Sequence, residues 1–164
     1  MKLFVGIVIC IFIAACNSPI GNFTVSEPNG WIVKDSISKK FGKSVLMHPA
    51  FQSSVPIFVE NIRVSIINFP SLSIYLDRTF ANLKERSFYF KKLDNGLLRV
   101  NGNDFEWERH IIQNSLESEQ VEQKNYFYSE SGNIYQFVCT SKIDSMERLQ
   151  PNIDKVLQSF KVVK

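Results

Sequence analysis

Cysteine and histidine are scarce in this sequence, which has three Cys and two His among 164 residues. So few cysteines exclude a disulfide-dense miniprotein. An excess of charge of one sign is also nearly absent, because 19 basic and 16 acidic side chains leave a formal net charge of +3. Nucleic-acid-binding surfaces need clustered Lys and Arg, so this balance argues against one. The 45% of hydrophobic residues indicates a globular chain rather than a disordered one.

The common catalytic and cofactor motifs are missing as well. The sequence contains no GxSxG, GxGxxG, CxxC or HExxH pattern. Gly42-Lys43-Ser44 matches the end of a phosphate-binding loop, but Ile37 stands where the first glycine of that motif belongs, and residues 45–47 are typical of a strand. We therefore expect a turn at this point, no cofactor, and no reaction that the sequence alone identifies.

The first residues have the pattern of an export signal. Lys2 is the only charged residue before Asn17, and residues 3–13 form an apolar run with one glycine. This run is shorter than the roughly 20 residues of a helix that spans a bilayer. A positive start, a short apolar stretch and small residues at the end are typical of a cleaved signal peptide, which we assign to residues 1–15.

The residues Ile13-Ala14-Ala15-Cys16 resemble the lipobox of bacterial lipoproteins. The resemblance implies cleavage after Ala15, a diacylglyceryl group on the Cys16 sulfur and a further acyl chain, usually palmitate, on the new amino group. Two or three chains hold a protein firmly at a membrane, whereas one holds it marginally. The alternative is an ordinary secretory signal with an incidental cysteine. Asn17 resembles signals that permit outer-membrane sorting, so the expected location is the cell envelope, on the periplasmic face of the outer or inner membrane in a Gram-negative source.

Removal of the signal leaves a short tether and one domain. Residues 16–22 are the lipidated cysteine and a polar tether, whose extended reach of about 20 Å keeps the domain near the lipid. We assign residues 23–164 to a single domain, because no later segment is a Pro-, Gly- or Ser-rich linker and the chain has no internal repeat. Lys39, Lys40 and Lys43 are the candidates for facing anionic lipid, and a solvated loop is the alternative.

Cys139 is the thiol that remains once Cys10 is removed and Cys16 is lipidated, so no internal disulfide is expected. Because Cys139 lies in an apolar strand, we expect it to be buried as a small hydrophobic side chain. A histidine brought close by the fold would instead make it a nucleophile. His48 lies in a predicted loop without an acidic neighbour, and we expect it to serve packing or the surface.

Asp104, Glu106, Glu108 and His110 occupy every second position of a predicted strand, so they project from one face. Carboxylates and an imidazole on one face can hold a divalent cation or act as an acid and a base. Glu106, Glu108 and His110 are therefore the candidates for a metal or catalytic site. The alternative is a solvated strand face opposite the core, where charge discourages edge pairing.

The hydrophobic pattern predicts an α+β domain with helices packed on an antiparallel sheet. The predicted strands are 23–25, 31–33, 45–47, 62–69, 88–92, 105–113, 121–129 and 134–141, with a further short strand considered at 97–100. The predicted helices are 72–86 and one that begins near Pro151, before a last short strand at 160–163. Turns at 28–30, 94–96, 101–102 and 131–133 favour antiparallel neighbours. The aromatic run 88–90 is expected to be a strand buried on both faces.

Several short segments are the landmarks of a known family. They are Pro28-Asn29-Gly30-Trp31, Glu60-Asn61-Ile62-Arg63-Val64, Ser71-Leu72-Ser73-Ile74-Tyr75-Leu76, Gly132-Asn133-Ile134-Tyr135 and Ser159-Phe160. On these residues the chain resembles the PsbP-like family across essentially residues 23–164. The resemblance implies an α/β/α sandwich around an antiparallel sheet, in a family whose members mostly bind or assist other proteins. Photosystem members depend on an N-terminal extension, and only residues 17–22 separate Cys16 from Phe23, so a role in oxygen evolution is not expected.

Together these observations predict a bacterial cell-envelope lipoprotein. Its domain is expected to be a non-enzymatic module for protein binding, assembly or chaperoning, held near the membrane surface. The expected partners are the membrane, through the lipid anchor, and an envelope protein, with no nucleic acid. The alternatives are a small envelope enzyme, or a metal- or small-molecule-binding protein, that uses the face of Glu106, Glu108 and His110.

Overall fold

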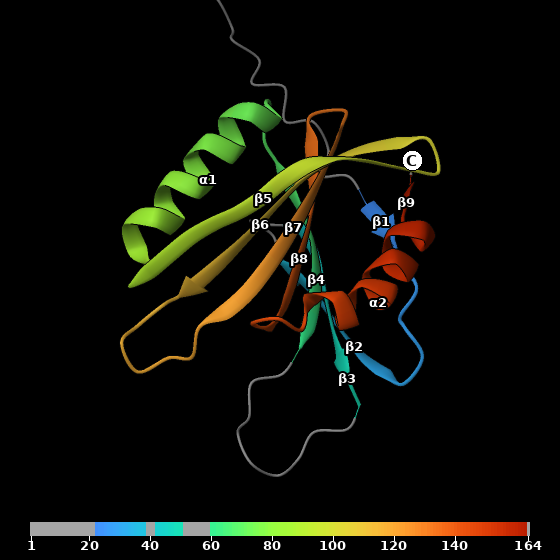
Figure 1. Ribbon diagram of the computed structural model, residues 1–164. Coiled ribbons are helices and arrows are strands. Elements are labelled where there is room, and N and C mark those ends of the chain that lie inside the picture. Colours follow the sequence, from blue (N-terminus) through green and yellow to red (C-terminus); the bar gives the residue numbers. More distant parts are fainter. Residues whose placement is uncertain (1–21, 39–41, 51–59, 164) are drawn as a thin grey trace, which may run out of the picture.

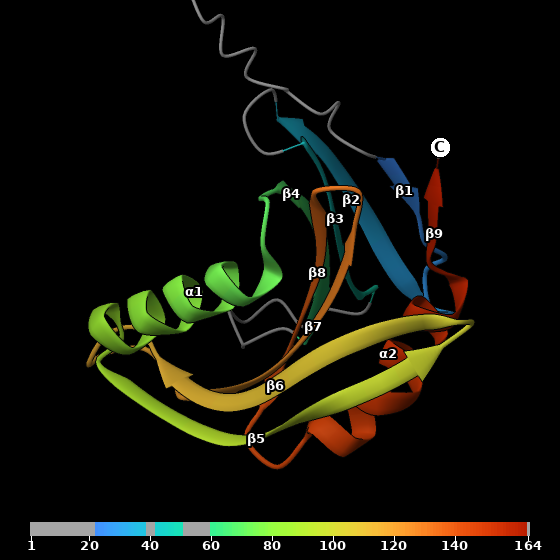
Figure 2. The same ribbon diagram turned by 90° about the horizontal axis from the view of Figure 1, so that it is seen from above.

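An antiparallel sheet forms the centre of the fold. The computed structural model describes residues 22–38, 42–50 and 60–163. Within them the main sheet has seven strands in the order β2-β3-β4-β8-β7-β6-β5, and a helix lies on each of its faces (Figure 1, Figure 2). The sequence prediction of an α+β fold, with a largely antiparallel sheet between helices, is therefore confirmed.

Most of the strands pair with their neighbours in the sequence. The strands are β1 (Asn22–Thr24), β2 (Trp31–Ser38), β3 (Gly42–Pro49), β4 (Asn61–Asn68), β5 (Tyr89–Val100), β6 (Asn103–Gln113), β7 (Val121–Glu130), β8 (Asn133–Lys142) and β9 (Lys161–Val163). The helices are α1 (Leu72–Arg86), between β4 and β5, and α2 (Met146–Ser159), between β8 and β9. The pairing of β4 with β8 joins the first strands to the later meander. No helix among the described residues is long and apolar enough to cross a membrane.

The main apolar core lies between the sheet and α2. In β4, Ile62, Val64 and Ile66 are buried, while the residues between them face the other side, as the predicted alternation requires. α2 contributes five buried side chains: Met146, Leu149, Ile153, Val156 and Leu157. After α2, the ring of Phe160 packs against four aromatic rings with centroids 5.2 to 6.1 Å away: Phe105, Tyr128, Tyr135 and Phe137. α2 and the aromatic cluster around Phe160 therefore fill this face of the sheet.

A small second sheet joins the start of the described chain to its end. β1 and β9 pair antiparallel, with Asn22 opposite Val163, and they lie together beside α2 (Figure 1). Phe23 of β1 is fully buried, and its ring contacts Phe160 and Tyr135 at centroid distances of 6.3 and 6.2 Å. The first described residues are thus fixed to the core rather than only to its surface.

The start of α2 differs from the prediction. The helix begins at Met146, whereas the sequence predicted a start near Pro151, which lies inside the helix. A proline within a helix removes one backbone hydrogen bond and usually marks its first turn. Here Met146 and Leu149 continue the apolar face of Ile153 toward the N-terminus, and all three are buried. Burial of this face overrides the local preference of the proline.

β5 also differs from the prediction, because residues 94–96 form part of a continuous strand and not a turn. The pairing of β5 with β6 shifts register between Lys92 and Asp94, which identifies a β-bulge there. Gly96 lies opposite Trp107, and a Cβ atom at Gly96 would lie 3.1 Å from the indole ring. The glycine thus leaves room for the Trp107 ring against the strand.

The aromatic run 88–90 is not buried on both faces, so that prediction is wrong. β5 is an edge strand of the sheet, and Phe88 just before it is 60% exposed. Gly42-Lys43-Ser44 opens β3 in place of the predicted turn, and Ser44 pairs with Ser36. A phosphate-binding loop is excluded there, because such a loop leads into a helix.

Candidate functional site

The two faces of the sheet are covered to different extents. α2 has five buried residues, whereas none of the 15 residues of α1 is buried. α1 lies on the face of the sheet opposite α2 (Figure 2), where Phe80 contacts β6 and β7 and Tyr75 contacts β8. Because the α2 face is filled by the apolar core, the α1 face is the candidate functional surface.

Aromatic side chains hold α1 against this face. The Phe80 ring lies 6.2 Å from that of Phe127 and 5.9 Å from that of His110, measured between centroids. The Tyr75 hydroxyl donates a hydrogen bond of 2.9 Å to Oε1 of Gln136 in β8. At the start of α1, the backbone N–H of Ile74 donates to the Ser71 hydroxyl, a typical helix cap. These few contacts position the helix while its apolar side stays half-exposed.

His110 is a buried histidine beneath α1. It is 0% exposed, and its ring lies between those of Phe80 and Phe90, 5.9 and 5.2 Å from their centroids. Burial lowers the pKa of His110, against a smaller opposing effect of its hydrogen bond to Gln123. The ring is therefore neutral at pH 7. In the tautomer with its proton on Nε2, it donates to Oε1 of Gln123 over 3.2 Å.

Polar side chains continue from His110 across the open part of the face. The strand register gives one row of Lys92, His110, Gln123, Thr140 and Asn61, and a neighbouring row of Glu108, Asn125, Val138 and Arg63. Asn125 is only 3% exposed. Nδ1 of His110 and Oδ1 of Asn125 are buried and have no hydrogen-bond partner among the described residues. Buried polar atoms usually have partners, so these two are exceptions.

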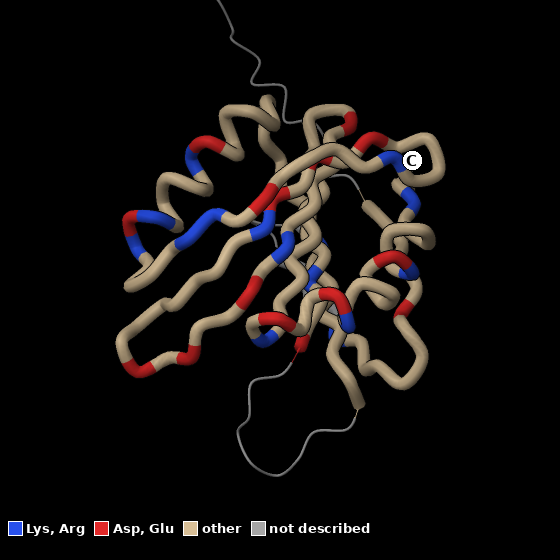
Figure 3. Tube along the Cα trace, in the orientation of Figure 1, with Lys and Arg blue, Asp and Glu red and all other residues tan. Residues whose placement is uncertain are grey.

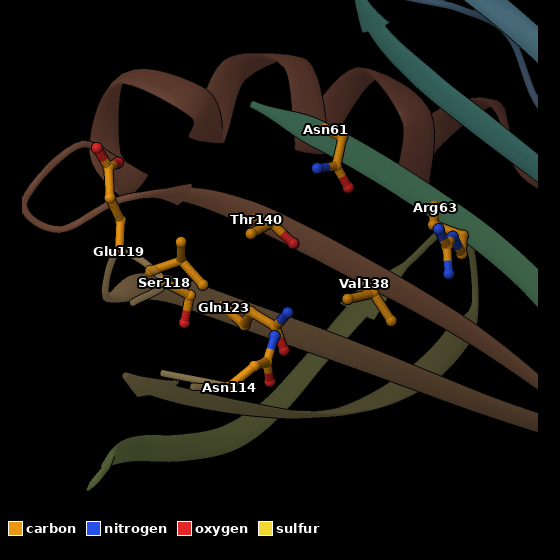
Figure 4. A pocket seen from close by; sticks show the side chains of 9 residues that line it. Asn61, Arg63, Asn114, Ser118, Glu119, Gln123, Val138 and Thr140 are labelled. Atoms are coloured by element: carbon orange, nitrogen blue, oxygen red, sulfur yellow. The ribbon is translucent and has the colours of Figure 1, made fainter. Parts of the chain in front are cut away.

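An open hollow of about 500 Å³ lies on this face beside α1. Figure 4 shows the side chains that surround it, which come from three strands and the β6–β7 connection. The lining residues are Asn61 and Arg63 of β4, Val138 and Thr140 of β8, Val121 and Gln123 of β7, and Asn114, Ser118 and Glu119. A smaller hollow of about 360 Å³, at the C-terminal end of α1, shares Asn114 with it.

The structure does not gather the acidic strand face and the histidine predicted from the sequence into one cluster of ligands among the described residues. Glu106, Glu108 and His110 share the α1 face of β6 as expected, but His110 is covered by α1 and Glu108 forms an ion pair of 3.0 Å with Lys92. Asp104 pairs with Arg99 over 3.5 Å at the far end of the strand. In the part of the chain that the structure describes, no three His, Cys, Asp or Glu side chains are placed to hold a metal ion.

The structure supports the core assignment of Cys139. Its side chain is fully buried, and burial raises the pKa of its thiol. A thiol that stays protonated is a poor nucleophile. His48 is also mostly buried, with Nδ1 3.1 Å from the Pro49 carbonyl oxygen, in agreement with a packing role.

Of the predicted membrane-facing lysines, only Lys43 is described. Its Nζ donates to the Phe23 carbonyl oxygen over 3.1 Å and lies 5.2 Å from the centroid of the Phe23 ring. Lys43 thus already binds β1, which makes it less free to meet lipid. Lys39, Lys40, Ala15 and Cys16 lie outside the described residues.

A second polar cluster, not foreseen from the sequence, lies on the α2 side of β6 and β7. Glu122 is 1% exposed and forms an ion pair with Arg109. Nζ of Lys124 lies 4.6 Å from the Trp107 ring centroid and donates to Oε1 of Gln150 in α2 over 3.0 Å. Burial lowers the pKa of Lys124. Each of these charges has a partner inside the fold, so the cluster connects α2 to the sheet rather than forming an open site.

Comparison with solved structures places the fold among PsbP-like proteins. The chain superposes on CyanoP, the cyanobacterial PsbP of Synechocystis sp. PCC 6803, with a TM-score of 0.58 and 16% identity over 86% of each chain. It superposes on LpqN of Mycobacterium tuberculosis, a protein involved in cell envelope biogenesis, with a TM-score of 0.58 and 13% identity over 91% of this chain and 88% of LpqN.

A Pseudomonas aeruginosa protein of unknown function, PA94, also has this architecture. It matches with a TM-score of 0.53 and 13% identity over 77% of this chain and 94% of its own. No protein-family model matches the sequence, and no curated protein matches it either. At these identities the similarity establishes a PsbP-like fold and nothing finer.

Proposed function

We propose that this protein is a lipid-anchored binding module of the bacterial cell envelope, which holds a partner protein on the α1 side of its sheet. The observation that carries the proposal is the difference between the two helices. α2 is packed into the core, whereas α1 rests on the sheet with none of its residues buried. A half-exposed apolar helix beside an open sheet face offers a partner apolar surface to cover.

Exposed apolar side chains add to this surface. Ile74 on α1 is 48% exposed, and Phe88 just after α1 is 60% exposed. Burying such side chains contributes roughly 25 cal/mol per Å² of apolar area. Positive and negative charges are interspersed along the described chain (Figure 3), which favours recognition by contact over long-range attraction of a highly charged partner.

The envelope location rests on the sequence and is consistent with one neighbour. Residues 1–15 have the pattern of a signal peptide, and Cys16 follows a lipobox-like segment. LpqN, which shares the fold, is involved in cell envelope biogenesis. A protein anchored at Cys16 would present its domain within a short distance of the membrane surface.

Substitution of the proposed anchor tests the location. Cells that express the wild-type chain or Cys16→Ser are labelled with a palmitate analogue and then fractionated. We expect the wild type to carry label and to sediment with membranes, and Cys16→Ser to be unlabelled and released with the soluble envelope fraction. Retention of Cys16→Ser on membranes without label would refute the anchor.

Crosslinking from α1 tests the binding surface. A photoreactive residue is placed at Ile74 on α1 and, as a matched control, at the exposed Gln158 of α2 in the full lipidated chain. We expect irradiation of cells to give one discrete crosslinked protein from position 74 and at least fivefold less of it from position 158. Equal crosslinking from both positions, or none from position 74, would contradict the proposed surface.

A further inference from the structure

The hollow beside α1 is lined by an arginine that has no ion-pair partner among the described residues. Arg63 projects from β4 at an exposed position, and it forms no hydrogen bond or ion pair with any residue that the structure describes. The nearby acid Glu60 pairs with Arg148 instead. Arg63 lies among the lining side chains in Figure 4, with its guanidinium group available for an anion.

A fixed amide donor lies on the same face. Oε1 of Gln123 accepts the hydrogen bond of His110, which leaves the Gln123 NH₂ group as the free end of the amide. Because burial keeps His110 neutral and the rings of Phe80 and Phe90 confine it, this orientation is held in place. Thr140 lies opposite Gln123 in the next strand and adds a hydroxyl group to the lining.

Asn125 lies near the hollow but is not part of its lining. Asn125 lies opposite Val138 in β8 and two residues after Gln123 on the same face, but it is only 3% exposed and is not among the residues that line the hollow. Its Oδ1 atom accepts no hydrogen bond from the described residues. The choice of ligand therefore rests on the residues that line the hollow, among them Arg63, Gln123 and Thr140.

The dimensions of the hollow suit a small molecule. Its volume of about 500 Å³ lies within the usual range of ligand sites, roughly 300 to 1,000 Å³. Val121 and Val138 give the lining two apolar patches between polar groups. Such a mixture suits a sugar ring, which has apolar C–H faces and a polar rim.

We propose that this hollow binds a small hydroxylated anion, a sugar acid or a sugar phosphate. Arg63 pairs with the carboxylate or phosphate group, and Gln123 and Thr140 bond to hydroxyl groups. Val138 contacts a C–H face of the sugar. This inference goes beyond the proposed function, because it requires neither the lipid anchor nor a protein partner.

Calorimetric titration of the full chain in detergent tests the proposal. The probes are glucuronate, glucose 1-phosphate, glucose and inorganic phosphate. We expect saturable heat from glucuronate or glucose 1-phosphate, and which of them binds more tightly distinguishes a carboxylate ligand from a phosphate ligand. Glucose and inorganic phosphate should each bind at least tenfold more weakly than the better of the two.

Matched variants locate the binding. Arg63→Met should weaken it at least tenfold, whereas Arg99→Met, at an exposed position near the end of β5, should leave it unchanged. Thr140→Val should weaken it as well, which serves as a second test if Arg63→Met unfolds. Thermal melting confirms that each variant folds. Absence of saturable heat from both sugar anions, equal binding by inorganic phosphate, or equal loss in Arg63→Met and Arg99→Met would overturn the proposal.

Discussion

Nε2 of His110 lies 3.2 Å from Oε1 of Gln123, between two neighbouring strands and beneath α1. This contact connects a buried titratable ring to a side chain that lines the open hollow. The ring is fully buried and so provides no exposed base. Its burial has measurable consequences for stability.

The first prediction concerns pH. Burial lowers the pKa of folded His110, whereas in the unfolded chain it is about 6.5. Below pH about 6.5 the unfolded state therefore binds more protons, and stability falls as the pH drops toward the lowered pKa of the folded state, by at most about 1.4 kcal/mol per pH unit. In His110→Gln this contribution is absent.

Urea unfolding of the wild type and His110→Gln at pH 7.5 and pH 5 measures the effect. The wild type should lose more free energy of unfolding between these two values than the variant does. His48 is present in both chains and cancels in the comparison. An identical loss in both chains would show that His110 is not the group responsible.

The second prediction compares two ion pairs. Glu122 is almost fully buried, pairs with Arg109, and also accepts the backbone N–H of Asp144 over 3.3 Å. Removal of one partner of a buried pair typically costs about 3 to 5 kcal/mol, so Glu122→Ala should destabilise the protein strongly. Glu108→Ala breaks the more exposed pair with Lys92 and should cost less than about 1 kcal/mol. Denaturant melts decide the order, and similar costs for the two substitutions would contradict it.

The third prediction compares the two helices. Leu149→Ala opens a cavity beneath α2 and should cost about 2 to 5 kcal/mol of the free energy of unfolding. Leu76→Ala on α1 removes a half-buried side chain and should cost roughly 1 kcal/mol. Amide hydrogen exchange should also be faster in α1 than in α2, because few buried contacts hold α1. Equal protection of the two helices from amide exchange would contradict the interpretation that α1 is held less firmly than α2.

The fourth prediction concerns Cys139. Because its thiol is fully buried and its pKa is raised, it should not react with a thiol reagent at pH 8 in the folded protein. It should react promptly in concentrated guanidinium chloride. Mass spectrometry of the labelled protein follows both reactions, and rapid modification under native conditions would show that the strand opens or that the thiol is accessible.

Local sequence patterns predicted correctly those elements whose structure follows from their own residues. The apolar spacing after Ser71 predicted a helix over residues 72–86, and the structure has α1 at the same residues. Alternation in β4 correctly predicted which of its residues face the core. Local sequence patterns gave wrong predictions where the structure of a segment depends on contacts with another element. Gly96 lies within β5, where the ring of Trp107 on the paired strand packs against it. α2 begins before Pro151 because Met146 and Leu149 are buried in the core.

The candidate site was harder to predict because no single segment contains it. Alternation correctly placed Glu106, Glu108 and His110 on one face, but it does not tell which part of that face a helix covers. α1 covers His110, and Lys92 neutralises Glu108. The hollow combines Arg63 of β4, Gln123 of β7 and Thr140 of β8, and only the strand order brings these residues together.

The pairing of β1 with β9 determines the path of mechanical tension through the molecule. A pull on the residues that precede β1 acts on Phe23, which is embedded in the core, and on β9, which directly follows α2. The load is therefore carried by the closed side of the sheet. α1 and the adjoining hollow lie outside this path, so a pull on β1 should leave the shape of the α1 face unchanged.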